Sequence, residues 1–287
     1  MSKSQNVPKS LTTTPPSHGT YLVLSYPAKH VLQLTLNRPR SLNAMTDDFK
    51  ADIGRVMDWF ERENDLWVVI VTGNGRAFCA GQDLKKWKKK QDAGSRREAE
   101  EMVEDINGFA SLSRRRCIKP IIAAVNGIAM GGGVEILLNC DLVVASRDAK
   151  LGLPEVKRGV VALAGGIPRL QRIAGHQLAA DLLLTGRTIT AEEAHVKYRF
   201  VTSVVPPSQV LSTAIDLAKE IVANSPEAVW STKKALLDGQ EYGNLEEAVR
   251  KHNLSEESKK VYQGENIREG LAAFSEKRKP VWGNPKL

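Results

Sequence analysis

The stretch "GIAMGGGVEILLNCD", residues 127–141, places three consecutive glycines ahead of a glutamate and an apolar run. The pattern predicts a turn that leads into a buried helix. The first backbone N–H groups of a helix lack partners within it and lie at its positive end. The glycines therefore fit a site that stabilises negative charge, or tight helix–strand packing that only small residues allow. Glu135 is the unusual residue, because a carboxylate is costly to bury.

The apolar runs on either side of this stretch predict strands. Three β-branched runs are typical of strands buried on both faces: "LWVVIVTG" (66–73), "PIIAAVNG" (120–127) and "DLVVAS" (141–146). The segment "HVLQLTLN" (30–37) alternates as a half-buried strand does. A helix is predicted over 46–63, with Thr46 as its N-cap. This alternation of strands and helices predicts an α/β layered core with parallel strands.

The chain of 287 residues suits one large domain or two unequal ones. Residues 1–19 are rich in Ser, Thr and Pro, which predicts a disordered N-terminal arm. The α/β pattern fills residues 20–206. Successive amphipathic helices follow, so residues 207–287 are predicted to form a helical C-terminal domain.

Composition excludes several classes of function. The net charge of +8 favours anionic partners, and nucleic acid, an anionic membrane surface and a phosphate-bearing cofactor all fit it. The three cysteines and five histidines are scattered without paired-ligand spacing, so we expect no metal site and a reducing compartment. There is no GxSxG motif and no apolar run long enough to predict a membrane span.

Two further stretches bear on chemistry. "GNGRAFCAGQDLK" (73–85) fails as a dinucleotide fingerprint, because Phe78 stands where the third glycine belongs. Its "CAGQD" turn fits either an ordinary loop or backbone N–H groups that face a ligand. "KLGLPEVKRG" (150–159) places Glu155 after Pro154; alone, Glu155 would be a solvated loop residue. With Glu135 it forms a pair of carboxylates beside a candidate oxyanion site, which acid–base chemistry next to a carbonyl requires.

Together these stretches resemble the crotonase (enoyl-CoA hydratase/isomerase) superfamily. The resemblance runs through six motifs: "LNRPRSLNAM" (36–45), "AFCAGQDLK" (77–85), "AAVNGIAMGGGVEILLNCD" (123–141), "LGLPEVKRG" (151–159), "LTGRTITAEEA" (184–194) and "AFSEKRKP" (273–280). It implies a crotonase-like ββα spiral core. It also implies that the helical C-terminal domain forms a homotrimer or a dimer of trimers and completes the CoA site.

The resemblance implies specific roles at the site. The backbone N–H groups of Gln82 and Gly132 would hold the thioester oxygen of an acyl-CoA and stabilise an enolate. Glu135 would take a proton from water as it attacks C3, and Glu155 would hold that water and protonate C2. Retention of both glutamates favours a hydratase, or its reverse, a dehydratase. No cofactor is implied beyond coenzyme A as part of the substrate.

The resemblance also assigns residues to the substrate and CoA site. These are Arg40, Ser41, Ala80, Asp83, Leu84, Lys85, Gly131, Phe274 and Lys277. Phe274 and Lys277 often reach CoA from a neighbouring subunit in this family. Ala162 and Ile167 stand where many hydratases carry proline and threonine, so the identity of the acyl group stays open.

Alternatives remain at this stage. A Δ3,Δ2-enoyl-CoA isomerase and a crotonase-type enzyme of secondary metabolism both share these motifs. The run "KKWKKK" (85–90) fits a solvated basic face, a CoA contact at Lys85 or, more distantly, an RNA-binding relative. The C-terminal "PKL" is a variant of the peroxisomal address and predicts binding to the import receptor, with cytoplasm or mitochondrion as alternatives.

Overall fold

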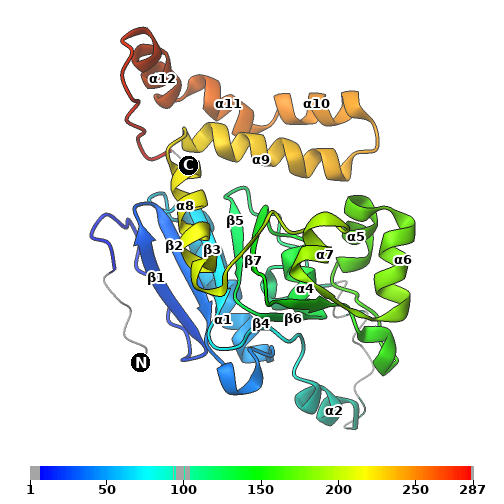
Figure 1. The fold of residues 1–287 in the computed structure, drawn as a ribbon. Helices are drawn as coiled ribbons and strands as arrows, with labels where there is room; N and C mark the ends of the chain where they lie inside the picture. Colours follow the sequence, from blue (N-terminus) through cyan, green and yellow to red (C-terminus); the bar gives the residue numbers. More distant parts are fainter. Residues whose placement is uncertain (1–6, 93, 95–99, 101–103, 286–287) are drawn as a thin grey trace.

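The computed structural model describes residues 7–92, 94, 100 and 104–285 (Figure 1). A six-stranded sheet has the order β1-β2-β3-β5-β7-β10, antiparallel between β1 and β2 and parallel elsewhere. Its strands are β1 (Leu22–Ala28), β2 (Val31–Leu36), β3 (Val68–Gly73), β5 (Ile121–Val125), β7 (Leu142–Ser146) and β10 (Ser203–Val205). The strands predicted over 30–37, 66–73, 120–127 and 141–146 are confirmed as β2, β3, β5 and β7.

A second sheet has the order β4-β6-β8-β9, with only β8 and β9 antiparallel among these strands. Its strands are β4 (Ala77–Cys79), β6 (Ile128–Met130), β8 (Lys150–Gly152) and β9 (Thr188–Thr190). The successive pairs β3/β4, β5/β6 and β7/β8 each give one strand to each sheet, so the chain winds as a spiral. This confirms the predicted crotonase-like α/β core.

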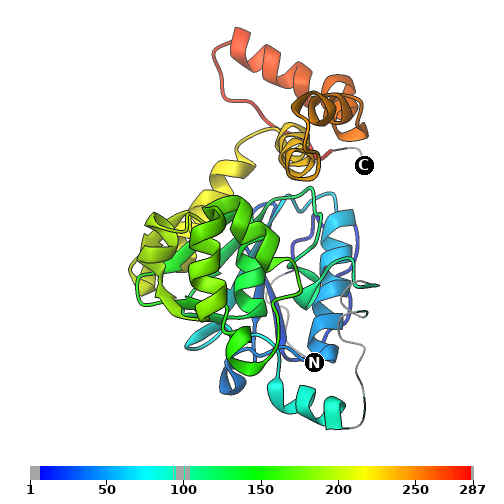
Figure 2. The ribbon, with the colours of Figure 1, turned by 90° about the vertical axis from the view of Figure 1, so that its right-hand side faces the viewer.

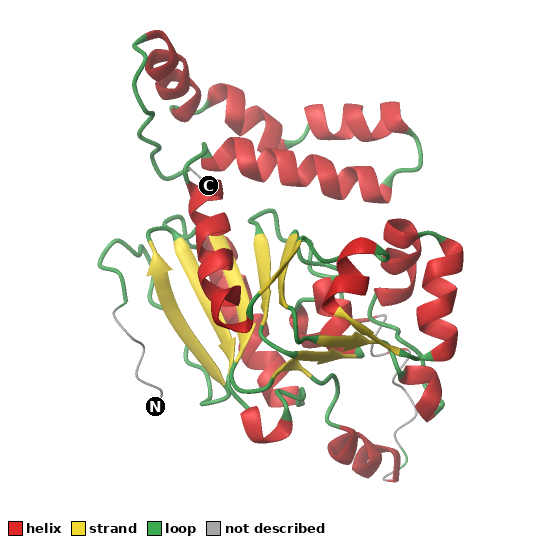
Figure 3. Cartoon of the chain, in the orientation of Figure 1, coloured by secondary structure: helices red, strands yellow, loops and turns green. Residues whose placement is uncertain are grey.

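Helices cover the spiral (Figure 3). They are α1 (Asp47–Arg62), α2 (Leu84–Asp92), α4 (Gly132–Leu137), α5 (Gly166–Ala174), α6 (His176–Thr185) and α7 (Ala191–Val196). Helix α1 begins as predicted, since the Thr46 side chain accepts from the Phe49 N–H. Its buried face, including Phe49, Ile53 and Phe60, packs into the main core with β2 and β3 residues such as Leu34 and Val71. Apolar burial of this kind is the main driving force for the fold.

The remaining helices follow residue 206. They are η4 (Pro207–Gln209), α8 (Val210–Val222), α9 (Pro226–Glu241), α10 (Leu245–Asn253), α11 (Glu256–Gln263) and α12 (Asn266–Ser275). Figure 2 shows α9 to α12 standing above the α/β body. Helix α8 does not join them: its Ala214 and Ala218 pack on Ile70 and Ile122 of the large sheet. The predicted boundary at 206/207 is therefore wrong for α8, and the physical division lies between α8 and α9.

The N-terminal arm is ordered over the residues that the structure describes. Thr12 and Thr13 each donate a backbone N–H and a hydroxyl to the carboxylate of Glu63, at 2.6–3.0 Å. The Ser10 hydroxyl donates to Asp65. The prediction of disorder is therefore wrong for residues 7–19, because the Ser and Thr side chains that suggested it hydrogen-bond to acidic groups at the end of α1. Residues 1–6 lie outside the described range.

The C-terminal segment returns to the body after α12. The Trp282 indole packs against the apolar cluster that contains Ala214 and Ala218 of α8, and it donates to the Ala223 carbonyl. The Asn284 amide donates to Asp65. Within the described residues, no helix is long and apolar enough to cross a membrane. The peroxisomal address stays a prediction, since 286 and 287 lie outside the described residues.

Candidate active site

A cavity of about 620 Å³ opens where the turns after β4, β6 and β8 meet. Its wall includes Gln82, Gly132, Glu135 and Glu155, so the four residues predicted to carry the chemistry share one space. Much of the remaining wall is apolar: Leu42, Met45, Leu84, Trp87, Phe109, Ile128, Met130, Val160, Val161 and Leu163. A concave apolar cavity with a few convergent polar groups is the usual form of a small-molecule site.

The consecutive glycines meet both expectations raised by their sequence, at different positions. Gly133 is a packing residue, since a Cβ there would lie 2.2 Å from the Cys79 carbonyl oxygen. Gly131 is the N-cap of α4 with φ 56°, and Gly132 is the first helical residue. The N–H of Gly132 therefore has no carbonyl partner within the helix, and its residue lines the cavity.

Gln82 is held in place by a β-bridge with Met45. The Met45 N–H donates to the Gly81 carbonyl at 2.8 Å, and the Asp83 N–H donates to the Met45 carbonyl at 3.0 Å. Because peptide groups alternate in direction along an extended segment, the Gln82 N–H points away from Met45. A Cβ on Gly81 would lie 3.5 Å from the Gly132 nitrogen, so the two turns are in contact. The two residues predicted to form the oxyanion site therefore lie on turns that contact each other, and both line the cavity.

Glu135 lies in the first turn of α4 and is only 4% exposed. Its Oε1 accepts from the Gly166 N–H, the first residue of α5, at 3.0 Å. A Cβ on Gly166 would lie 2.8 Å from the Glu135 Cγ, so only glycine allows this contact. Burial, aided by the charge of Glu155, raises the pKa of Glu135 to about 7. Such a carboxyl can both accept and donate a proton near neutral pH.

Glu155 begins the short helix η3 (Glu155–Arg158), directly after Pro154. Its Oε1 lies 2.9 Å from the position of a Cβ on Gly131, so its carboxyl stands over the glycine turn. Its Oε2 is buried without a hydrogen-bond partner among the described residues. Burial raises the pKa of this carboxyl as well. The cavity wall thus holds the buried Glu135 and the half-buried Glu155, whose charges interact.

Residues 27–285 match the family model described as enoyl-CoA hydratase/isomerase. The chain belongs to this family. It is 44% identical over 265 residues to the mevalonyl-coenzyme A hydratase sidH of Aspergillus fumigatus, covering 92% of this chain and 96% of that protein. It is 41% identical over 284 residues to the mevalonyl-coenzyme A hydratase SIDH of Beauveria bassiana, covering 97% and 100%.

A solved enoyl-CoA hydratase from Mycobacterium tuberculosis H37Rv has the same fold. Its TM-score is 0.82 at 34% identity, covering 93% of this chain and 100% of that one. The family resemblance seen in the motifs is therefore confirmed, and the protein is an enzyme of the crotonase superfamily.

The family residues expected around CoA fall into two groups. Ala80, Leu84 and Gly131 line the cavity. Arg40, Ser41, Asp83 and Lys85 do not line it. Asp83 instead accepts from the guanidinium of Arg38 at 2.8 Å, and this ion pair joins the turn before α1 to the start of α2. The role of Arg38 was not predicted, because the family motif that contains it assigns the CoA contacts to Arg40 and Ser41.

Phe274 and Lys277 lie far from α2, near the C-terminus of the chain. Phe274 is on α12 and is 87% exposed, and Lys277 follows that helix. Figure 1 places α12 at the opposite end of the molecule from α2, and neither residue lines the cavity of its own chain. Their contact with CoA stays a prediction.

Phe109 and Trp87 line the cavity, and the sequence motifs did not predict a role for either residue there. Phe109, from η2 (Phe109–Ser111), lies against Gly132. A Cβ on Gly132 would be 2.6 Å from the Phe109 ring. The turn that presents it is strained, with φ 56° at Ala110, and no local motif signals it. Trp87 lines the cavity beside Leu84, three residues before it in α2. The three-residue spacing between Leu84 and Trp87 predicts that both lie on one face of a helix, but the lysines around Trp87 made this pattern hard to recognise.

Proposed function

We propose that this enzyme adds water reversibly across the C2–C3 double bond of an enoyl-CoA. The observation that carries the proposal is that the buried Glu135 and the half-buried Glu155 line one cavity together with Gly131 and Gly132. The pKa values of both carboxyls are raised, that of Glu135 to about 7, and the charge of Glu155 contributes to the shift at Glu135. Two such carboxyls can act as a general acid and a general base: one donates a proton to a substrate atom, and the other removes a proton from a neighbouring atom.

In the direction of hydration, Glu135 removes a proton from water while the water oxygen bonds to C3. The π electrons move onto the thioester oxygen, where the N–H groups of Gln82 and Gly132 stabilise the enolate. Glu155 then protonates C2 and the carbonyl re-forms. We propose no metal and no separate cofactor, with coenzyme A entering as part of the substrate.

The test is a panel of trans-2-enoyl-CoA thioesters of increasing chain length, with and without a methyl branch on C3. Hydration removes the conjugated enoyl-thioester absorbance, so each addition of enzyme should lower it. The Glu135→Gln variant, which keeps the acceptor for the Gly166 N–H, should be nearly inactive. Absence of hydration across the whole panel would overturn the proposal.

An isomerase that shifts a 3-enoyl to a 2-enoyl thioester is the nearest alternative. Supplying a 3-enoyl-CoA separates the two reactions. A hydratase leaves this substrate unchanged, whereas an isomerase makes the conjugated absorbance rise before any water is added.

For the acyl group, we propose a short, 3-methyl-branched thioester of the mevalonyl type. Two relatives named for mevalonyl-coenzyme A match almost the full chain at 44% and 41% identity. Mevalonyl carries a hydroxyl and a methyl on C3, so its dehydration is the reverse of the reaction above. We expect kcat/KM for dehydration of mevalonyl-CoA to exceed that for an unbranched 3-hydroxyacyl-CoA of equal length by at least about tenfold.

We further propose a homotrimer or a dimer of trimers, in which Phe274 and Lys277 reach the CoA of a neighbouring subunit. Their distance from their own cavity and the exposure of Phe274 support this assembly. Sedimentation equilibrium gives the subunit number. An RNA-binding role for α2 is less favoured, because Leu84 and Trp87 of that helix line the cavity; strongly salt-dependent RNA affinity would support it.

A further inference from the structure

The two catalytic carboxyls differ in what fixes them, and the position of Glu155 needs an explanation. Its Oε2 has no partner among the described residues. The backbone donor to this carboxyl is the N–H of Glu155 itself, so the carboxyl is placed through the turn that carries it. That turn packs against Gly186, where a Cβ would lie 3.1 Å from Val156 Cγ2 and 3.3 Å from the Pro154 Cα.

Gly186 ends α6 in the left-handed conformation, with φ 57° and its N–H donating to the Leu182 carbonyl. The chain then turns sharply into β9, whose Thr188 pairs with Gly152 of β8. Gly152 lies three residues before Glu155, and its carbonyl accepts from the Gly131 N–H at 2.9 Å. The segment 186–188 thus touches the Glu155 turn on one side and supports its approach strand on the other.

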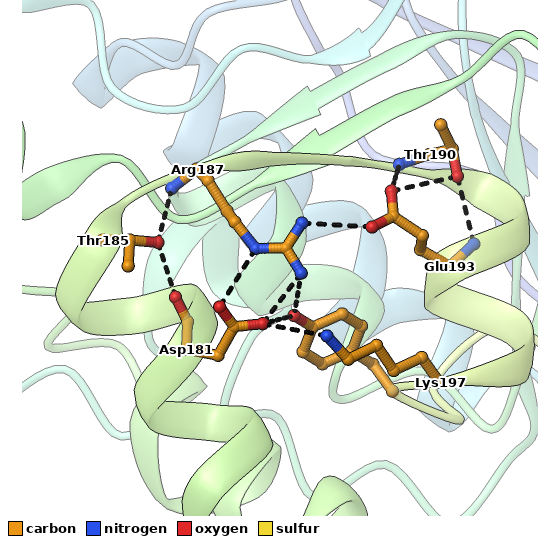
Figure 4. A network of polar contacts seen from close by, with 7 residues as sticks. Asp181, Thr185, Arg187, Thr190, Glu193 and Lys197 are labelled. Carbon is orange, nitrogen blue, oxygen red and sulfur yellow. Dashed lines mark hydrogen bonds and ion pairs between the residues drawn. The ribbon is translucent and has the colours of Figure 1, made fainter.

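Arg187 fixes this segment (Figure 4). Its guanidinium donates to both carboxylate oxygens of Asp181 on α6, at 2.8 and 3.3 Å, and to Glu193 on α7 at 3.1 Å. It also donates to the hydroxyl of the buried Tyr198 at 2.6 Å. One planar side chain therefore joins the middle of α6, the first turn of α7 and the buried Tyr198.

The partners are themselves tied in place. Glu193 closes a capping box with Thr190, the N-cap of α7. The Tyr198 hydroxyl donates to Asp181 at 2.5 Å, and Lys197 pairs with the same carboxylate at 3.1 Å. The chain of contacts runs from Asp181 and Glu193 through Arg187 and Gly186 to the turn of Glu155. Asp181, Arg187 and Glu193 are not among the residues that line the cavity.

We propose that Arg187 is a positioning residue for Glu155, acting through Gly186 and β9 rather than by touching substrate. The inference rests on the proposed hydratase function. Misplacement of a catalytic group by about 1 Å can cost about 10²-fold in rate. Loss of the guanidinium should therefore lower kcat far more than it weakens substrate binding.

The experiment compares Arg187→Gln with Arg187→Lys and with a matched control, Arg115→Gln. Arg115 also pairs with two carboxylates, Asp58 and Glu61, and does not line the cavity. We expect Arg187→Gln to lower kcat about 10- to 100-fold with KM within about twofold. Arg187→Lys should recover part of the loss. Arg115→Gln should lower the melting temperature but keep kcat within about twofold.

A double variant shows whether the effect passes through Glu155. In a Glu155→Gln background, single-turnover rates should be unchanged by Arg187→Gln. An undiminished kcat in Arg187→Gln, or an equal loss with and without Glu155, would overturn the proposal. If Arg187→Gln does not fold, Asp181→Asn tests the same contact. A wild-type enzyme without hydratase activity would refute the proposed function instead, so the two failures are distinguishable.

Discussion

Glu135 and Glu155 reach one cavity from two regions that hold their side chains differently. Glu135 sits on a helix and accepts directly from the backbone N–H of Gly166. Glu155 follows a proline in a turn, and its Oε2 has no partner among the described residues. The first carboxyl is fixed by a hydrogen bond, and the second by the packing of its backbone.

This difference has a consequence for mutation and for pH. Glu135 should respond to changes that crowd its carboxyl, whereas Glu155 should respond to changes in the frame of β8, β9 and α6. Both pKa values are raised by burial, and the charge of Glu155 adds to the shift at Glu135.

Removing either carboxyl should abolish most of the activity. Glu135→Gln and Glu155→Gln are each expected to lower kcat for enoyl-CoA hydration by about 10²–10⁴-fold, because each removes one acid–base group. Steady-state kinetics on the best thioester of the panel measures it. If one variant kept kcat within about twofold, that glutamate would have no acid–base role.

Crowding the direct contact should disturb Glu135 alone. In Gly166→Ala, the new methyl group would lie 2.8 Å from the Glu135 Cγ and would displace its carboxyl. We expect kcat to fall by about 10²-fold. Gly239→Ala in α9 is the control, since nothing lies within 4 Å of its Cβ position. Equal activity in the two variants would show that the Gly166 contact does not position Glu135.

Burial of Glu135 should cost stability at alkaline pH. Its folded-state pKa of about 7 exceeds the ordinary 4.5, so the stability this group contributes is complete below pH 4.5 and lost as the pH rises through 7. Glu135→Gln cannot ionise and should be more stable than wild type at pH 8 by about 1–3 kcal/mol. The difference should shrink towards pH 5. Urea unfolding at both pH values measures it, and a Gln variant less stable at pH 8 would contradict the burial argument.

The smallest effect concerns the coupling of the two charges. The charge of Glu155 helps to raise the pKa of Glu135, so Glu155→Gln should lower the pKa of Glu135 from about 7 by less than one unit. Carbon NMR of labelled glutamate side chains reports this titration directly. An unchanged or higher pKa in the variant would mean that the two carboxyls do not interact.

Sequence motifs predicted the parts of the site that local patterns encode. The glycine turn before Glu135, the Pro154–Glu155 pair and the Gln82 turn each lie in one short stretch, and the fold brings all of them to one cavity. The strands could be predicted for the same reason, since β-branched runs are local signals. Thr46 capped its helix as expected.

What escaped prediction depends on contacts between distant segments. Phe109 reaches Gly132 through a strained turn that no propensity signals. Gly166 and Arg187 act on the glutamates across gaps of about 30 residues. The order of the arm over 7–19 depends on Glu63, more than 40 residues away. Such partners are set by tertiary packing, which composition and periodicity do not contain.

The central claim is that Glu135 and Glu155 handle one water molecule as a unit. The most direct test is the kcat of the Glu135→Gln/Glu155→Gln double variant beside the two single variants. Groups that act together are grossly non-additive, so the double variant should fall within about threefold of the less active single variant. A loss equal to the product of the two single losses would show that the carboxyls act independently, and would contradict the account.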